Sequence, residues 1–120
     1  MQAGTLFDAA DGRPVVQHVQ RTTNAWNRLR GLLARPALAA DAALWLIPCN
    51  SVHTCFMGYA IDVVFLDREL RVLAVVPSLR PWRACGRLRA HSTLELAADG
   101  AARCGLIVGQ QLHWRTTVDS

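Results

Sequence analysis

The chain of 120 residues contains no lysine, so all 13 of its basic side chains are arginine. We interpret this absence as a bias of genomic base composition and not as a functional feature. The formal net charge of +4 modestly favours anionic partners. That charge is too small to indicate nucleic-acid binding, which is typically accompanied by a strongly basic surface.

Long apolar segments are also missing. No run approaches the ~18 residues that a membrane-spanning helix needs, and residues 1–5 lack the basic and apolar parts of a secretory signal. From the sequence as it stands we expect a soluble, cytoplasmic protein. Hydrophobic residues make up 52% of the chain and charged residues 18%, which predicts one globular domain over residues 1–120.

The familiar short motifs of enzymes and metal sites are absent. There is no glycine-rich phosphate loop, no G-x-S-x-G elbow and no H-E-x-x-H pair, and none of the 4 cysteines belongs to a C-x-x-C pair. The sequence therefore indicates no cofactor and no particular reaction. We expect free, buried thiols in a reducing compartment, with a Cys49–Cys85 bridge as the alternative for an exported form.

Short apolar segments separated by turn residues predict a mainly β fold of the α+β class. One amphipathic helix is expected from about 23 to 35, because Trp26, Leu29 and Leu33 share a face and Pro36 follows. About seven to eight short strands and this helix predict a compact β-sandwich or barrel. The strands are expected at residues 5–7, 15–19, 44–47, 52–57, 61–66, 72–76, 93–97 and 111–116, with one helical turn at residues 100–104.

Residues 48–67 place histidine, cysteine and aspartate side chains within two apolar strands. Strand alternation puts His53, Cys55 and Met57 on one face. These are soft metal ligands, but three from a single strand are too far apart to converge, so we predict no metal site. Cys49, on the loop before the strand, is the thiol better placed to contact His53, although a structural cysteine is the preferred interpretation.

Asp62 lies in the otherwise apolar strand 61–66. A buried carboxylate needs hydrogen bonds or a cation, and we predict Arg28 as its partner, on the polar face of the helix one turn from Gly31. An ion pair that fastens the helix to the sheet is the preferred interpretation of Asp62, and a general acid or base is the alternative.

Glu95 interrupts a run of leucines whose alternation places it on a solvated face or in a groove. Together with His53 and Asp62 it forms the set of catalytic candidates. If the three converge, they provide the acid and base groups of a hydrolase or lyase.

Residues 78–91 lack periodicity and are predicted to form a long loop rich in arginine. Arg80 and Arg83 can bind phosphate, an acidic polymer or an acidic protein surface, with Trp82 as a stacking platform. A solvated arginine-rich loop in which Trp82 folds onto the core is the preferred interpretation, and the binding loop is the alternative.

Several short motifs run in order from about residue 15 to residue 116: NRLRGLL at 27–33, VHTCFM at 52–57, IDVVFLD at 61–67, PW at 81–82, LEL at 94–96 and GLIVG at 105–109. This ordered set resembles the Domain of Unknown Function 192 family of bacterial and archaeal proteins. The resemblance implies a small jelly-roll-like β domain with a packed helix, and it implies no established reaction. Many relatives look exported or membrane-tethered. The family's signature positions would be Arg28, Gly31, His53, Met57, Asp62 and Glu95.

The chain departs from the family pattern at three positions. Cys55 stands where an aromatic residue is typical, which weakens a catalytic or copper role for this thiol. Leu70 replaces the usual glycine of a hairpin. Gln110 replaces an acidic residue that commonly follows the last glycine, so any role of a charge there is lost.

We expect a binding module, acting as an accessory domain for an unknown small anionic ligand or a protein partner. A hydrolase or lyase is the alternative, and a soft-metal protein using His53, Met57 and a cysteine is a weaker third hypothesis. The sequence does not indicate an oligomeric state. The expected binding residues are Asn27, Arg28, His53, Thr54, Met57, Asp62, Arg80, Trp82 and Arg83.

Overall fold

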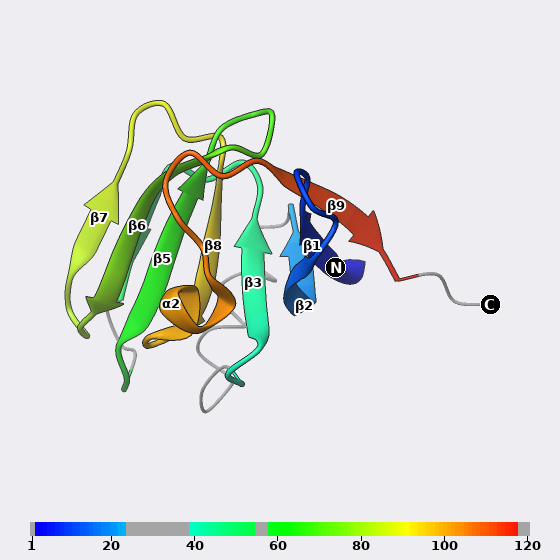
Figure 1. The fold of residues 1–120 in the computed structure, drawn as a ribbon. Coiled ribbons are helices and arrows are strands. Elements are labelled where there is room, and N and C mark those ends of the chain that lie inside the picture. Colours follow the sequence, from blue (N-terminus) through cyan, green and yellow to red (C-terminus); the bar gives the residue numbers. More distant parts are fainter. Residues whose placement is uncertain (1, 24–38, 55–57, 118–120) are drawn as a thin grey trace.

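The computed structural model describes residues 2–23, 39–54 and 58–117. Within these residues the chain forms nine strands and one short helix, which confirms the mainly β prediction (Figure 1). The elements are β1 (Gln2–Asp8), β2 (Pro14–Thr22), β3 (Ala42–Leu46), β4 (Ser51–His53), β5 (Ile61–Leu66), β6 (Val72–Leu79), β7 (Ala84–Gly86), β8 (Ser92–Ala97), α2 (Gly100–Cys104) and β9 (Leu112–Thr116).

Seven of these strands form one sheet in the order β6-β5-β8-β3-β2-β1-β9, and β4 and β7 pair separately as an antiparallel ribbon. The large sheet is open, with β6 at one edge and β9 at the other, and so it does not close into a barrel. The first and last strands of the chain, β1 and β9, are antiparallel neighbours. Figure 1 shows the β4–β7 side and β9 at opposite ends of the molecule.

The centre of the sheet is buried on both faces because its strands are apolar at successive positions, not only at alternate ones. All six residues of β5 are buried, as are five of the six in β8. On one face Val64 and Leu94 belong to an apolar cluster that includes Ala101 of α2. On the other face Val63 and Leu44 belong to a second cluster, which Val52 of β4 and Cys85 of β7 join. The short helix and the ribbon thus cover opposite faces.

Two hairpin turns contain a residue with positive φ. Gly12 has a φ of 74° in the hairpin between β1 and β2, a conformation that glycine adopts without steric cost. Leu70 closes the β5–β6 hairpin with a φ of 67°, so this leucine adopts the left-handed conformation that usually favours glycine. Its partial burial against the first apolar cluster offers compensating contacts.

The predicted strands at residues 5–7, 15–19, 44–47, 61–66, 72–76, 93–97 and 111–116 are confirmed, as is the helical turn at 100–104. The prediction of one long loop over residues 78–91 is wrong, because β6 extends to Leu79 and Ala84–Gly86 forms β7. The predicted strand at 52–57 begins as β4, and its residues 55–57 lie outside the described part of the chain, as does nearly all of the predicted helix. Of the described helices, none has the length and apolar character needed to cross a bilayer.

Candidate functional site

Thr54 holds the turn of residues 80–83 against the end of β4. It is fully buried, with 0% relative exposure. Its N–H donates to the Arg83 carbonyl at 2.8 Å, and its own carbonyl accepts the Trp82 N–H at 3.2 Å. Its hydroxyl donates to the Arg80 carbonyl at 2.6 Å and accepts the Arg83 N–H at 2.9 Å. The sequence analysis expected Thr54 to contact a ligand. In the structure this side chain is inaccessible to solvent and holds the turn in place.

Trp82 projects from this turn with 58% of its surface exposed. The preferred interpretation from the sequence, in which Trp82 folds onto the core, is therefore wrong, because the indole is exposed. Its backbone has a φ of 65°. A non-glycine residue in the left-handed region costs on the order of 1 kcal/mol and persists only where its surroundings enforce it. The hydrogen bonds of Thr54 hold the backbone of Trp82 in this conformation.

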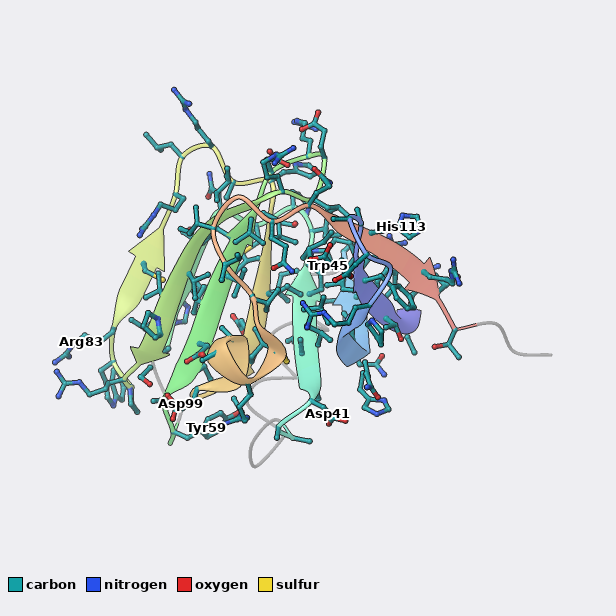
Figure 2. The ribbon with its side chains drawn as sticks, viewed as in Figure 1. Asp41, Trp45, Tyr59, Arg83, Asp99 and His113 are labelled. Atoms are coloured by element: carbon teal, nitrogen blue, oxygen red, sulfur yellow. The ribbon has the colours of Figure 1, made fainter. Side chains whose placement is uncertain are left out.

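Basic residues lie near Trp82 in the turn and on the strand beside it. Arg80 and Arg83 are exposed on either side of it in the chain, and Figure 2 shows Arg83 extending away from the sheet at the outer edge of the molecule. His53 is exposed on β4, where it pairs with Ala84 of β7. Residues 78–91 contain no acidic residue. We call His53, Arg80, Trp82 and Arg83 the cationic turn.

Asp62 is buried to 1% exposure and accepts three backbone N–H bonds. Ser78 donates to Oδ1 at 2.8 Å, Asp99 to Oδ1 at 3.1 Å and Ala101 to Oδ2 at 2.9 Å. Asp99 is the N-cap residue of α2 but makes no side-chain capping bond. The Asp62 carboxylate takes over that role, since bonds from N–H groups to an anion are among the stronger hydrogen bonds. Its predicted partner, Arg28, lies outside the described residues.

Glu95 is buried to 1% exposure, so the prediction of a solvated face or groove is wrong. β8 lies between β5 and β3, and both faces of this strand are covered. Glu95 stands opposite Val63 and Leu44, on the face that the β4–β7 ribbon covers.

The catalytic candidates do not converge. Asp62 stands opposite Leu96, on the face that carries α2, whereas Glu95 stands opposite Val63 on the other face. The sheet therefore separates the two carboxylates. His53 is exposed at the surface, while both carboxylates are 1% exposed. This geometry does not assemble the acid/base trio that the alternative hypothesis requires.

The described cysteines Cys49, Cys85 and Cys104 are free thiols. Cys49 donates to the Ser51 carbonyl at 3.1 Å, so its bond is with the main chain and not with His53. Burial is the main cause that raises the pKa of Cys85 and of Cys104, which keeps both protonated and weakly nucleophilic at neutral pH.

Three of the predicted site residues, Asn27, Arg28 and Met57, fall outside the described residues, as do Cys55 and the family signature position Gly31. Among residues 2–23, 39–54 and 58–117, no three histidine, cysteine or acidic side chains are grouped as metal ligands would be.

Two hollows are lined by residues that, apart from Cys49, sequence reasoning did not single out. One, of about 230 Å³, is lined by residues 48–50, Ala90 and His91. The other, of about 290 Å³, lies along β1 and β9 and includes Phe7, His113 and Arg115. The only signal in the sequence was the two-residue spacing of His113 and Arg115, which places both on one face of a strand but does not show what lies opposite.

Comparison with known proteins places this fold in a family. The profile of Domain of Unknown Function 192, described as "Uncharacterized ACR", matches residues 7–114. A putative transcription regulator from Sinorhizobium meliloti is similar in structure, with a TM-score of 0.78, 18% identity, and coverage of 94% of this chain and 92% of that one. A protein of unknown function from Novosphingobium aromaticivorans has a TM-score of 0.72 and 15% identity, with 93% and 84% covered. No curated protein matches significantly. The matched residues 7–114 show that the chain belongs to the Domain of Unknown Function 192 family.

Proposed function

We propose that the chain is a binding module that recognises an anionic ligand or an acidic partner protein through the cationic turn. The observation that supports this most is Trp82, which is 58% exposed and held in a strained backbone conformation by the buried Thr54. Strain of this kind is typical of functional sites, where the surrounding structure fixes a conformation that the residue would not choose.

The chemistry of the turn suits an anion with a flat or apolar body. Arginine presents a planar donor fork to a carboxylate or phosphate, and tryptophan offers a large rigid surface. These two residue types dominate binding energy at protein interfaces. Arg80 and Arg83 flank Trp82 on a turn that is already ordered, so less conformational entropy is lost on binding. We include Asn27, Arg28 and Met57 in the proposal only as expected neighbours of this surface.

The hydrolase or lyase alternative has less support. It needs His53 and a carboxylate within hydrogen-bond reach of one substrate atom. Asp62 is instead saturated by three main-chain donors under α2, and Glu95 is buried on the other face of the sheet. We therefore do not include Asp62 in the proposed recognition surface, and we assign it a structural role.

The proposal is tested by fluorescence anisotropy with a labelled polyglutamate peptide at low salt. The double variant Arg80→Gln/Arg83→Gln and the single variant Trp82→Ala are each expected to weaken binding at least about tenfold, which corresponds to ~1.4 kcal/mol. Arg68→Gln/Arg103→Gln removes the same charge from two exposed arginines elsewhere and is the matched control.

Equal loss in the control and the turn variants would show that net charge alone is responsible, and the proposal would fail. A single-stranded oligonucleotide of equal charge is measured in parallel. Tighter binding to the oligonucleotide than to the peptide would contradict an acidic protein partner.

A further inference from the structure

The hollow along β1 and β9 lies at the opposite edge of the sheet from the cationic turn (Figure 1). Its volume of about 290 Å³ is at the lower limit of small-molecule sites, which typically measure roughly 300–1,000 Å³. A ligand that fits is therefore restricted to about the size of one ring with a short substituent. The lining residues are Phe7, Asp8, Ala9, Gly12, His113 and Arg115.

Strand pairing explains why an aromatic ring and two basic side chains meet here. Phe7 stands opposite His113, and Thr5 stands opposite Arg115, so all four share one face of the β1–β9 ladder. The residue between the two basic ones, Trp114, points to the other face and contacts Trp45 in the core. Figure 2 shows His113 on the far side of β9 from Trp45. The basic groups thus face outward.

Arg115 lies with its guanidinium carbon 5.2 Å from the centre of the Phe7 ring. A contact of this kind between a cation and an aromatic ring is favourable even at an exposed site. A guanidinium carries five N–H donors, so a contact with one ring leaves donors for a further partner. A carboxylate can accept two parallel N–H bonds from an arginine.

The acidic residue at the border of the hollow is already engaged. Asp8 Oδ1 accepts the Ala10 N–H at 2.8 Å, and Oδ2 accepts the Gln110 side-chain amide at 2.8 Å. Asp8 is itself a lining residue of the hollow, but both of its carboxylate oxygens already accept hydrogen bonds from within the chain. The lining groups that can contact an anion are His113 and Arg115.

Gly12 and Ala9 add little bulk to the lining of the hollow, since glycine has no side chain and alanine has only a methyl group. A Cβ placed on Gly12 would have no atom within 4 Å, and its φ of +74° disfavours a side chain.

We infer that this hollow binds a small carboxylic acid with an apolar ring, whose carboxylate contacts Arg115 and His113 while the ring lies against Phe7 and Ala9. The site is independent of the cationic turn, since the two lie at opposite edges of the sheet. Either can fail its test without the other.

Benzoate is the probe. It is titrated into the full isotope-labelled chain, and amide chemical shifts are followed by NMR. We expect saturable shifts centred on Phe7, Ala9, His113 and Arg115, with millimolar affinity. Benzyl alcohol, a neutral molecule of similar shape, is expected to bind at least about tenfold more weakly because it lacks the charge that the guanidinium recognises.

Arg115→Gln is expected to weaken benzoate binding about tenfold, and Arg115→Lys several-fold, because lysine keeps the charge but not the planar fork. Arg68→Gln, at an exposed site in the β5–β6 turn, is the control and is expected to bind like the parent. Circular dichroism verifies that each variant is folded.

Three outcomes would overturn the inference: shifts that are not centred on the hollow, unchanged binding in folded Arg115→Gln, or inorganic phosphate binding as tightly as benzoate. The last would identify a general oxyanion site without a role for the Phe7 wall.

Discussion

At the scale of single residues, Asp62 shows how a buried charge can be structural without a side-chain partner among the described residues. The carboxylate replaces the capping group that α2 does not obtain from Asp99 and joins that helix to β5 and to the end of β6. The prediction that a buried Asp62 carboxylate needs hydrogen bonds or a cation is confirmed for the hydrogen bonds. It did not indicate main-chain donors, because their positions depend on the conformations of Ser78 and Asp99, both with positive φ.

Asp62→Asn is expected to destabilise the protein by about 2–4 kcal/mol, because the amide removes the charge and directs an N–H₂ group at a main-chain donor. The free energy of unfolding is measured with urea. Asp99→Asn is the control, expected to change stability by less than about 0.5 kcal/mol, since asparagine tolerates the left-handed conformation and the Asp99 side chain makes no capping bond. Equal effects in both variants would refute the structural role of the Asp62 charge.

The hydrogen bond from Gln110 to Asp8 makes the free energy of unfolding depend on pH in the acidic range. The Gln110 side-chain amide is the main cause that lowers the pKa of Asp8, followed by the Ala10 N–H. A lowered folded-state pKa stabilises the folded protein above the ordinary aspartate value of about 3.9, and this contribution is lost as pH falls through the lowered value. Gln110→Ala is expected to move the Asp8 pKa upward and to flatten the fall in Tm in this acidic range.

The Asp8 carboxyl signal in a carbon-13 NMR titration measures that pKa directly. Gln111→Ala is the control, because the neighbouring amide donates to main-chain carbonyls of Glu69 and Leu112 and not to Asp8. An unchanged Asp8 pKa in Gln110→Ala would contradict the assignment. An acidic residue at position 110 could not donate this hydrogen bond when ionised.

At the scale of elements, the Thr54 hydroxyl is one of the groups that hold the turn beside the β4–β7 ribbon. Thr54→Val keeps the shape of the side chain but removes the bonds to Arg80 and Arg83. We expect a loss of about 1–3 kcal/mol and faster hydrogen exchange at the Arg83 amide. Thr54→Ser retains the hydroxyl and should preserve the protection of that amide. Equal protection in the valine and serine variants would show that the hydroxyl does not hold the turn.

The elements differed in how far they could be predicted. β5 and β8 are runs of apolar residues that are long enough to be recognised locally. β7 was missed because Ala84–Gly86 is only three residues long and becomes a strand through pairing with Ser51–His53, far away in the chain. Alternation correctly separated Glu95 from its leucine neighbours, but it could not show that both faces of β8 are covered. Burial on the second face is a tertiary property.

At the scale of the whole molecule, the class of the fold was predictable and the assembly of the site was not. The mainly β class follows from local patterns, whereas the separation of Asp62 from Glu95 follows from the pairing register of β5 and β8. A shift by one residue would have placed both carboxylates on one face. The candidate site predicted from His53, Arg80, Trp82 and Arg83 lies on one ribbon and its turn, because those residues are close in the folded chain through the β4–β7 pairing.

The adjacency of β1 and β9 has a consequence for biosynthesis. During translation β1 emerges early from the ribosome, yet its outer neighbour is synthesised after every other strand of the sheet. Contacts between such distant segments form late and slowly. The wall that Phe7 and Arg115 build together therefore exists only after β9 has been synthesised and has paired with β1. A ligand that binds this wall would stabilise the state in which β1 and β9 are paired.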